Sequence, residues 1–214
     1  MGGWGDILKE IYGAQGIVHL GDVLLAGVYL LTKKPINTLA DLAGMKLRAP
    51  GAYGSHMREL GVAPVTMAFA EVYTSLATGV IDGCASSNLV DYRDGKWYEQ
   101  AKYLYPLPLS GAQASPVIVN KGAWDTLPAD LQATLASLNV DHCWEHAGLS
   151  IMTVGEAVEQ MKAAGAQFTA APSDEDRQKW KAAAAKVWEE FAAADAGSKK
   201  LIDAQAAFLA KIGA

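Results

Sequence analysis

The sequence predicts an α/β fold, in which short strands alternate with helices along the chain. Three strand-like segments lead to this prediction, and they begin at residues 45, 63 and 80. A turn or a helix follows each of them, as is typical of strands joined into one open sheet. The chain has 214 residues, of which 51% are hydrophobic, so it can bury a sizeable core as one or two domains.

The first of these strands is the segment MKLRAP. Met45 and Leu47 point to one side of it, and Lys46 and Arg48 point to the other. The proline and glycine that follow stop the strand, because proline cannot donate a hydrogen bond to a neighbouring strand. Arg48 is therefore expected at the carboxyl end of this strand.

The second strand, APVTM, spans residues 63–67, and Phe69 with a short helix over residues 70–78 follows it. Gly79 ends that helix, since glycine adopts a positive φ without strain. The third strand is expected to begin with the apolar pair Val80-Ile81.

Ligands of open α/β sheets bind in the crevice beyond the carboxyl ends of the strands. We therefore expect Arg48, Met67 with Phe69, and the residues after Gly83 to meet in one place.

Turn residues divide the chain on either side of this stretch. Before it we expect a short helix, two strands broken by Gly21-Asp22 and a helical turn, at Asp6–Gly13, Val18–Leu20, Val23–Leu31 and Leu39–Leu42. After it we expect the proline-marked loop YPLPLSG and a strand at Pro116–Asn120.

Helices dominate the carboxyl-terminal half. One is expected to begin at Pro128, and a longer one from Asp141 to Ala164, stopped by Gly165, has a length of about 36 Å. A short strand at residues 167–170 precedes a helix that begins at Ser173 with three acids. The side chains expected to face the core on this helix and on a last one over residues 199–212 are Trp180, Ala184, Val187, Phe191, Leu201, Ala204, Phe208 and Ile212.

Charge and hydropathy exclude two classes of partner. The net charge of −5 argues against nucleic acid, which requires a basic stripe. The apolar run Val23–Leu31 is far shorter than the ~20 residues that a membrane helix needs. Residues 1–4 lack the basic start of a signal peptide, so none is expected in this sequence.

The two cysteines, Cys84 and Cys143, are too few for a disulfide framework or a cysteine-based zinc site. The sequence leaves open one disulfide between them or two separate thiols.

The stretch from Asp41 to Gly83 follows the pattern D-L-x-G-x-K-[IL]-R-x-P, then L-G-A-x-P-x-x-M, then [FS]-x-E-V-Y-x-[AS]-L-x-x-G-x-x-D-G. The matching residues are Asp41, Gly44, Lys46, Arg48, Pro50, Leu60, Gly61, Pro64, Met67, Glu71, Val72, Tyr73, Leu76, Gly79, Asp82 and Gly83. This stretch resembles the second lobe of the periplasmic solute-binding subunit of TRAP transporters, the DctP-like family. A weaker likeness continues through KWYEQAKYL, VNKGAWDTLP and the carboxyl-terminal helices.

The resemblance implies periplasmic-binding-protein-like (type II) lobes with a long bridging helix, and an incomplete first lobe. Roughly the first third of the family's fold has no counterpart here, as in a fragment, a misplaced gene start or a natural half-protein. The implied division is a remnant of lobe I with the hinge at 1–26 and 114–152, the ligand-binding lobe II at 27–113 and 153–172, and carboxyl-terminal helices at 173–214.

The resemblance also implies a function. Members of the family are periplasmic, bind a small organic acid and deliver it to a membrane permease without catalysing a reaction. We accordingly expect no enzyme activity, no cofactor, no metal and no nucleic acid partner. A homodimer is expected to cover the apolar surface that lobe I otherwise hides. The alternative is a truncated homologue that acts as a sensory or interaction module, with weak or no ligand binding.

Five residues are expected to bind the ligand. Arg48 offers a planar fork that matches a carboxylate, and by resemblance it is the arginine that grips the substrate. Met67 and Phe69 form an apolar wall, although the residues in this region also suit an ordinary core. Ser86 stands where the family usually has asparagine, and Gln113 faces either the cleft or solvent.

Two departures from the family pattern restrict the class of acid that can bind. Val28 falls at or near the place of a second arginine in some relatives, and Ala85 falls at the place of an acidic metal ligand in others. One strong anion anchor is left, which favours a monocarboxylate or oxo acid over a dicarboxylate.

The sequence gives only weak support for a catalytic or a metal-binding function. His142 and His146 share a helix face with Glu145, but the HExxH order requires the glutamate directly after the first histidine. No GxSxG elbow, phosphate loop or dinucleotide fingerprint is present. Cys84 just past a strand is the only candidate nucleophile, and the sequence places no histidine beside it.

Overall fold

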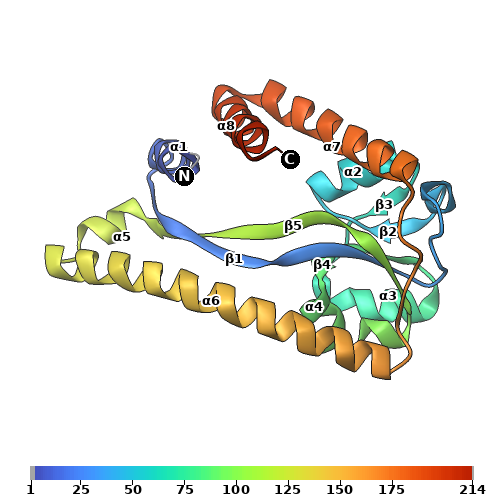
Figure 1. Ribbon diagram of the computed structural model, residues 1–214. Helices are drawn as coiled ribbons and strands as arrows, with labels where there is room; N and C mark the ends of the chain where they lie inside the picture. Colours follow the sequence, from blue (N-terminus) through green and yellow to red (C-terminus); the bar gives the residue numbers. More distant parts are fainter. Residues whose placement is uncertain (1–2, 214) are drawn as a thin grey trace. The chain divides into compact units, whose positions relative to one another are not determined.

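The computed structural model describes residues 3–213, and Figure 1 labels their elements. The strands are β1 (Ile17–Thr32), β2 (Lys46–Arg48), β3 (Ala63–Val65), β4 (Gly83–Asn88), β5 (Tyr103–Asn120) and β6 (Gln167–Phe168). The α-helices are α1 (Trp4–Gly13), α2 (Ala52–Glu59), α3 (Val72–Thr78), α4 (Leu89–Asp94), α5 (Lys121–Asp125), α6 (Ala129–Ala163), α7 (Asp174–Ala194) and α8 (Ala196–Ile212). Short 3₁₀ helices lie at η1 (Leu39–Leu42), η2 (Phe69–Glu71) and η3 (Trp97–Glu99). The predicted α/β class is confirmed.

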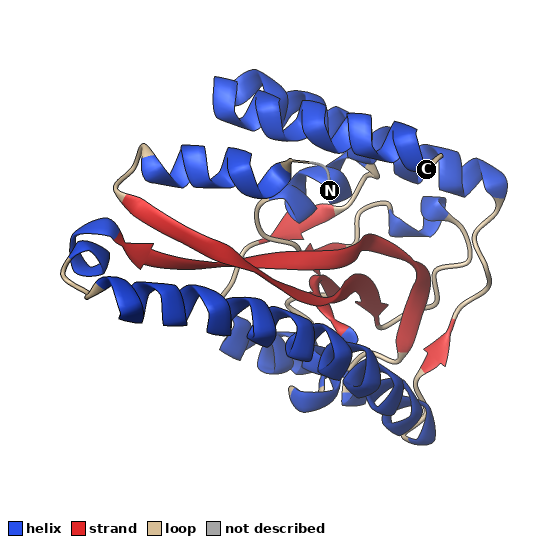
Figure 2. Cartoon of the chain, turned by 60° about the vertical axis from the view of Figure 1, so that its left-hand side comes forward, coloured by secondary structure: helices blue, strands red, loops and turns tan. Residues whose placement is uncertain are grey.

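The strands form one mixed sheet in the order β3-β2-β4-β1-β5-β6 (Figure 2, red). Strand β2 pairs in parallel with β3 on one side and with β4 on the other. Strand β1 then runs antiparallel to β4, and β5 is parallel to β6. The three central strands are therefore neighbours, with the strand that carries Arg48 in the middle. The third was predicted to begin at Val80 but begins at Gly83, because Val80 and Ile81 lie in the connection after α3.

The chain divides into two compact units. The first unit consists of the chain up to Leu25, Ala114–Leu149, and the chain from Trp188 onward. The second unit consists of Ala26–Gln113 and Ser150–Val187, and it holds β2, β3 and β4 entire. All five predicted ligand-binding residues belong to the second unit.

The core of the second unit consists of two hydrophobic clusters, one on each face of the sheet. Leu31 and Cys84 belong to one cluster, while their neighbours Leu30 and Ala85 belong to the other. Consecutive residues of a strand point to opposite faces, so the sheet separates the two clusters. Helices α3 and α4 with η3 supply side chains to the first cluster, and α2, α7 and η1 supply side chains to the second.

Several predicted boundaries are confirmed. Gly79 follows α3 with φ +80°, and Gly165 follows α6 with φ +90°, as expected of glycines that end helices. The helical turn Leu39–Leu42 is present as η1. Ser173 caps α7, because its Oγ accepts a hydrogen bond from the Asp176 backbone N–H at 3.1 Å.

The break predicted at Gly21-Asp22 is wrong, since β1 runs through it without interruption. A Cβ atom at position 21 would lie 2.6 Å from the side-chain nitrogen of Asn139. The glycine therefore allows another side chain to approach the strand closely, and it does not end the strand.

The loop predicted at YPLPLSG is also wrong, because Pro106 and Pro108 lie within β5. Strand β6 pairs with β5 only at Tyr103 and Leu104. The prolines follow on the part of β5 that has β1 as its only neighbouring strand within residues 3–213. Proline is tolerated there because an edge strand does not need every N–H for pairing.

The two helices predicted around Pro128 and Asp141 are one helix, α6. Neither proline nor glycine stands between Ala129 and Asp141, so nothing in that segment interrupts the helix. The predicted burial of the last two helices is wrong in part. Phe191 of α7 is exposed, no residue of α8 is buried, and Phe208 and Ile212 are exposed. Within the described residues, no helix combines the length and the apolar character needed to span a membrane.

Trp180 fixes α7 to the second cluster, and its replacement tests this packing. The indole is 5% exposed, contacts His56 and Tyr105, and donates from Nε1 to the Pro108 carbonyl oxygen at 3.1 Å. We expect Trp180→Ala to lower the free energy of unfolding by about 3–5 kcal/mol, measured by urea denaturation. The matched control Trp144→Ala removes an indole that is 76% exposed, and we expect a change within about 0.5 kcal/mol. Equal effects of the two variants would contradict this role.

His56 gives the same region a dependence on pH. Burial lowers the pKa of His56 below its usual value of 6.5, against the opposing contact of Nε2 with the Trp180 carbonyl oxygen at 3.2 Å. The unfolded chain then takes up the proton at a higher pH than the folded chain. We expect the free energy of unfolding to fall as pH drops from 6.5 through the folded pKa. Urea denaturation at several pH values between 7 and 5 should show that the free energy of unfolding changes less with pH in His56→Gln than in the unaltered protein. An equal dependence on pH in the two proteins would refute this assignment.

Candidate functional site

The pairing of three parallel strands brings the candidate site together. Arg48, the last residue of β2, lies opposite Val65 of β3 and opposite Cys84 of β4. Strands β2 and β3 therefore end at the same edge, as expected for a ligand site in an open α/β sheet, whereas β4 continues to Asn88. The prediction that the residues after Gly83 lie beyond the end of the third strand is wrong, because these residues form β4 itself. Met67 follows β3, and Ser86 lies two residues beyond Cys84.

The Arg48 guanidinium is held in place by two hydrogen bonds. Its Nε donates to the Met67 carbonyl oxygen at 3.3 Å, and its Nη1 donates to the Ser86 Oγ at 2.6 Å. The Ser86 hydroxyl in turn donates to the Arg48 carbonyl oxygen at 3.4 Å and lies 3.6 Å from the Cys84 Sγ. Ser86 can therefore accept from the guanidinium while its own hydrogen is directed back to the β2 backbone.

Phe69 completes this group with an aromatic face. The Arg48 Cζ lies 5.9 Å from the centroid of the Phe69 ring, within the range of a cation–π interaction. Phe69 is 47% exposed, and the centroid of its ring lies 4.8 Å from that of buried Trp97. Trp97 thus supports Phe69 from the core side, and close to half of Phe69 is left exposed.

The charge of Arg48 has no ion-pair partner among residues 3–213, and no hydrogen bond to its Nη2 is formed within them. The charge of Arg48 acts electrostatically on the carboxyl group of Asp91 in α4. Burial raises the pKa of Asp91, and a backbone hydrogen bond at Asn88 and the charge of Arg48 counteract that rise. The outer edge of the guanidinium is therefore available for an anion in a half-buried setting.

Gln113 belongs to a different group of side chains. Its Nε2 donates to the Tyr53 hydroxyl at 2.8 Å, and that hydroxyl lies 3.5 Å from the Ser110 Oγ. The structure thus brings Arg48 together with Met67, Phe69 and Ser86, while Gln113 contacts Tyr53. Tyr53 was not among the predicted site residues, although its place in the first turn of the helix after β2 is a signal that was present.

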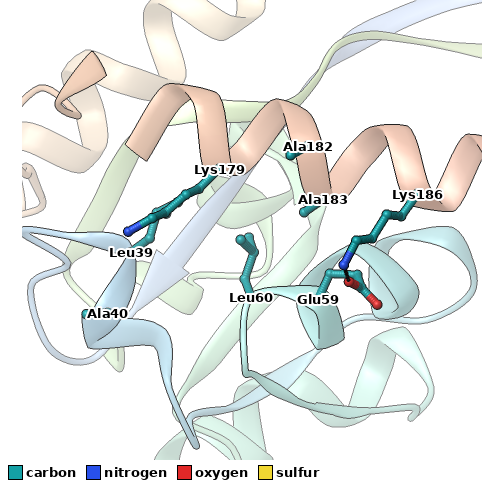
Figure 3. Close-up of a pocket in the computed structure, with 8 residues that line it drawn as sticks. All are labelled: Leu39, Ala40, Glu59, Leu60, Lys179, Ala182, Ala183 and Lys186. Carbon is teal, nitrogen blue, oxygen red and sulfur yellow. Dashed lines mark hydrogen bonds and ion pairs between the residues drawn. The ribbon is translucent and has the colours of Figure 1, made fainter. Parts of the chain in front are cut away.

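The second unit also has a cavity that other residues line. A cavity of about 340 Å³ is bounded by α7 on one side and by η1 and the end of α2 on the other (Figure 3). Leu39, Leu60 and Ala183 line it, and the ion pair of Lys186 with Glu59, 2.6 Å long, lies at its margin. None of the five predicted ligand-binding residues lines this cavity.

No cluster of three or more His, Cys, Asp or Glu side chains suited to a metal occurs in the described part of the chain. The His146 Nδ1 lies 3.0 Å from the Leu24 carbonyl oxygen, which occupies one of its ring nitrogens. Cys84 and Cys143 are both free, so of the two alternatives left open the structure has the separate thiols.

The fold is that of periplasmic solute-binding proteins. The family model described as bacterial extracellular solute-binding protein, family 7 (DctP), matches residues 5–195. The chain belongs to this family. The match confirms the predicted membership of the DctP-like family and the predicted periplasmic localisation. The family consists of solute-binding proteins of transport systems, so the prediction that the chain is not an enzyme agrees with its membership.

Two curated relatives illustrate the similarity. The C4-dicarboxylate-binding periplasmic protein DctP of Rhodobacter capsulatus is 30% identical over 192 residues, which cover 88% of this chain and 56% of that protein. The monocarboxylate 2-oxoacid-binding periplasmic protein of Nostoc sp. is 30% identical over 188 residues, covering 84% of this chain and 50% of that protein.

A solved structure gives the same result for the fold. A TRAP periplasmic solute-binding protein from Pseudomonas putida F1 with bound D-glucuronate superposes with a TM-score of 0.79 at 28% identity. The match covers 93% of this chain and 65% of that chain. This chain thus spans between half and two thirds of the length of the relatives described here.

The two thiols should differ in reactivity. Cys84 is fully buried beneath the Arg48 site, whereas Cys143 is half-buried. We expect Ellman's reagent to label Cys143 alone in the native protein and both thiols after unfolding, because reaction requires access to the thiolate. Cys143→Ser should then remove the native reaction. Rapid labelling of Cys84 in that variant would contradict its burial and would show that the reagent reaches the thiol beneath Arg48.

Proposed function

We propose that this protein is the extracytoplasmic solute-binding subunit of a TRAP transporter, which binds a small organic acid through Arg48 and delivers it to a membrane permease. The observation that carries the proposal is the fixed guanidinium at the carboxyl ends of β2 and β3, beside β4. Two of its N–H groups are occupied by the Met67 carbonyl oxygen and Ser86, and its Nη2 edge remains for a ligand.

The ligand that fits this edge is a carboxylate. A guanidinium keeps its charge and matches the two oxygens of a carboxylate with parallel donors. Because Met67 and Ser86 fix the orientation of the side chain before a ligand arrives, binding costs less conformational entropy. Phe69 offers an apolar face beside the charge, against which the body of a small ligand can pack.

A single anchor supports one carboxylate, and the ligand is accordingly a monocarboxylate or an oxo acid. Val28 and Ala85, the positions at which some relatives carry further charge, are both fully buried and apolar. A second carboxylate of a ligand would have no cation to meet at either position. The relatives are named for a dicarboxylate and a 2-oxo monocarboxylate, and the solved structure binds a uronate, so a carboxylate is common to all three.

The second unit is, in this proposal, the ligand-binding lobe, predicted at 27–113 and 153–172. The first unit contains the predicted remnant of the other lobe and the hinge, at 1–26 and 114–152. The helices from residue 173 onward are divided between the two units at Val187. Helix α6 passes from one unit to the other, as a bridging helix does.

Partners follow from the family. Delivery of the acid to a membrane permease is proposed for the complete transport system, since relatives of this chain belong to TRAP transporters. The expected homodimer has no support from the relatives, and it stays a prediction that light scattering at high protein concentration would test.

Replacing Arg48 tests the proposed function directly. Calorimetric titration with pyruvate and with D-glucuronate should detect binding of at least one of them to the unaltered protein. Arg48→Ala removes charge-assisted hydrogen bonds worth ~1.5–3 kcal/mol each, so we expect the dissociation constant to rise at least about 100-fold. Arg48→Lys keeps the charge but loses the fork, and we expect an intermediate loss.

The matched control is Lys46→Ala. Lys46 also belongs to β2 and carries the same charge, but it is exposed and lies on the strand two residues before Arg48. Its removal should leave the dissociation constant within about twofold. Similar losses from both variants would indicate general attraction by positive charge, and an unaltered protein that binds no monocarboxylate would refute the proposal.

A further inference from the structure

A cavity of the second unit lies between α7 and the segments that precede β2 and β3. Its volume is about 340 Å³, and Figure 3 shows it with α7 on one side and Leu39 and Leu60 on the other. None of the residues of the Arg48 site lines it. A volume of this size with a mainly apolar lining is typical of sites that bind small molecules. We call this space the α7 cavity.

The hollow arises from the sequence of α7. The residues of this helix that line the cavity recur at positions i, i+3, i+4 and i+7 and share one face of the helix: Lys179, Ala182, Ala183 and Lys186. The two alanines in the middle of this face end at Cβ, so they fill little of the space in front of them. The lysines at its two ends lie about 10 Å apart along the helix axis, since each residue adds about 1.5 Å.

The packing of α7 keeps the cavity open. Trp180 and Val187 stand on either side of the alanine stretch, and each is 5% exposed. The Trp180 indole packs in the second cluster, and the His56 Nε2 lies 3.2 Å from the Trp180 carbonyl oxygen. These buried side chains fix the position of the helix, so it cannot settle onto the leucines that face it. The hollow therefore keeps apolar surface that a ligand can cover.

The charged residues that line the α7 cavity are two lysines and one acid, Glu59. The Lys186 Nζ lies 2.6 Å from the Glu59 carboxylate, so these two charges offset each other at one end. At the other end the Lys179 Nζ lies 2.7 Å from Glu175, which is not part of the lining. The Lys179 and Glu175 side chains are 59% and 77% exposed, and an exposed pair of this kind contributes little to stability. A ligand anion can therefore replace Glu175 beside Lys179 at small cost.

An anion with an apolar chain matches this arrangement. Its carboxylate pairs with the Lys179 ammonium at one end, and its chain lies between the alanines of α7 and the two leucines that face them. The end of the chain meets the methylene stem of Lys186, which is apolar although its head is charged. The spacing of the lysines suits a chain of about eight carbon atoms, since a C–C bond is about 1.5 Å long. A ligand with polar groups along its length is disfavoured, because the apolar walls offer them no hydrogen bonds.

The α7 cavity is separate from the Arg48 site. Leu39 belongs to the hydrophobic cluster that contains Ala85, and Leu60 packs against that cluster. Ser86, which accepts a hydrogen bond from the Arg48 guanidinium, follows Ala85 in β4 and points to the opposite face of the sheet. The two sites therefore lie on opposite faces, and each can hold a ligand of its own.

We propose that the α7 cavity is a second ligand site, which binds a straight-chain monocarboxylate of medium length with its carboxylate at Lys179 and its chain against Leu39 and Leu60. This inference does not depend on the proposed function, because none of the residues involved contacts an acid held by Arg48. A ligand that binds here only in the folded state also raises the melting temperature of the protein.

The test uses the Arg48→Ala variant, so that an acid bound at Arg48 does not contribute to the signal. Calorimetric titration of this variant with butanoate, hexanoate and octanoate should show an affinity that rises about fourfold for each added methylene group. In the same variant, Lys179→Gln should weaken octanoate binding about tenfold, because the carboxylate loses its cation. The matched control Lys181→Gln removes the same charge from a residue of α7 that does not line the cavity, and it should change the affinity by less than about twofold.

Filling the cavity tests where octanoate binds. Ala183→Leu extends a side chain into the hollow, and we expect the affinity for octanoate to fall at least about tenfold because the chain loses its space. Ala185→Leu adds the same side chain on another face of α7, outside the lining, and should leave the affinity within about twofold. Ala182→Leu fills the same space from a more exposed position, should the melting temperature show that Ala183→Leu unfolds.

Three results would overturn the inference. They are an Arg48→Ala variant that does not bind octanoate, equal losses from Lys179→Gln and Lys181→Gln, and an affinity that the filled variants leave unchanged. None of them bears on the proposed function, which is tested with pyruvate and D-glucuronate at Arg48. Conversely, a failure of the unaltered protein to bind those two acids leaves the octanoate measurements, and the second site, as they stand.

Discussion

The arrangement of the site depends on the parallel pairing of β2 with both of its neighbours. This pairing sets Arg48 beside Val65 and Cys84, and the Met67 carbonyl oxygen and Ser86 follow at hydrogen-bonding distance. Gly83 protects the register, because a Cβ atom there would collide with the Leu31 carbonyl oxygen and press on Leu47. A glycine at the start of β4 is thus needed for the close approach of three strands.

Features that depend on neighbouring residues were predictable from the sequence. The positive φ values of Gly79 and Gly165, the cap at Ser173 and the turn at Leu39–Leu42 are encoded within a few residues of where they occur. The approach of Met67 to Arg48 followed from the general rule that parallel strands end at one edge, whereas Ser86 lies within β4 and not beyond its end. The structure adds the hydrogen bonds that fix the guanidinium.

Features that depend on distant partners were not predictable. Gly21 marks a break in the sequence, but in the fold it admits the side chain of Asn139. Pro106 and Pro108 suggest a loop until β5 is known to be an edge strand at that point. Tyr53 and Gln113 are separated by 60 residues, and no local pattern announces that their side chains will meet.

One of the two anchors of the Arg48 guanidinium is a main-chain carbonyl, and the other is a side chain at position 86. Mutation cannot delete the first, whereas a single codon change alters the second. In the proposed function, a substitution at position 86 would change the orientation of the Arg48 guanidinium, and with it the preference among ligands, while the charge is retained. Among related proteins that bind different acids, we therefore expect sequence variation at this site to be concentrated at position 86.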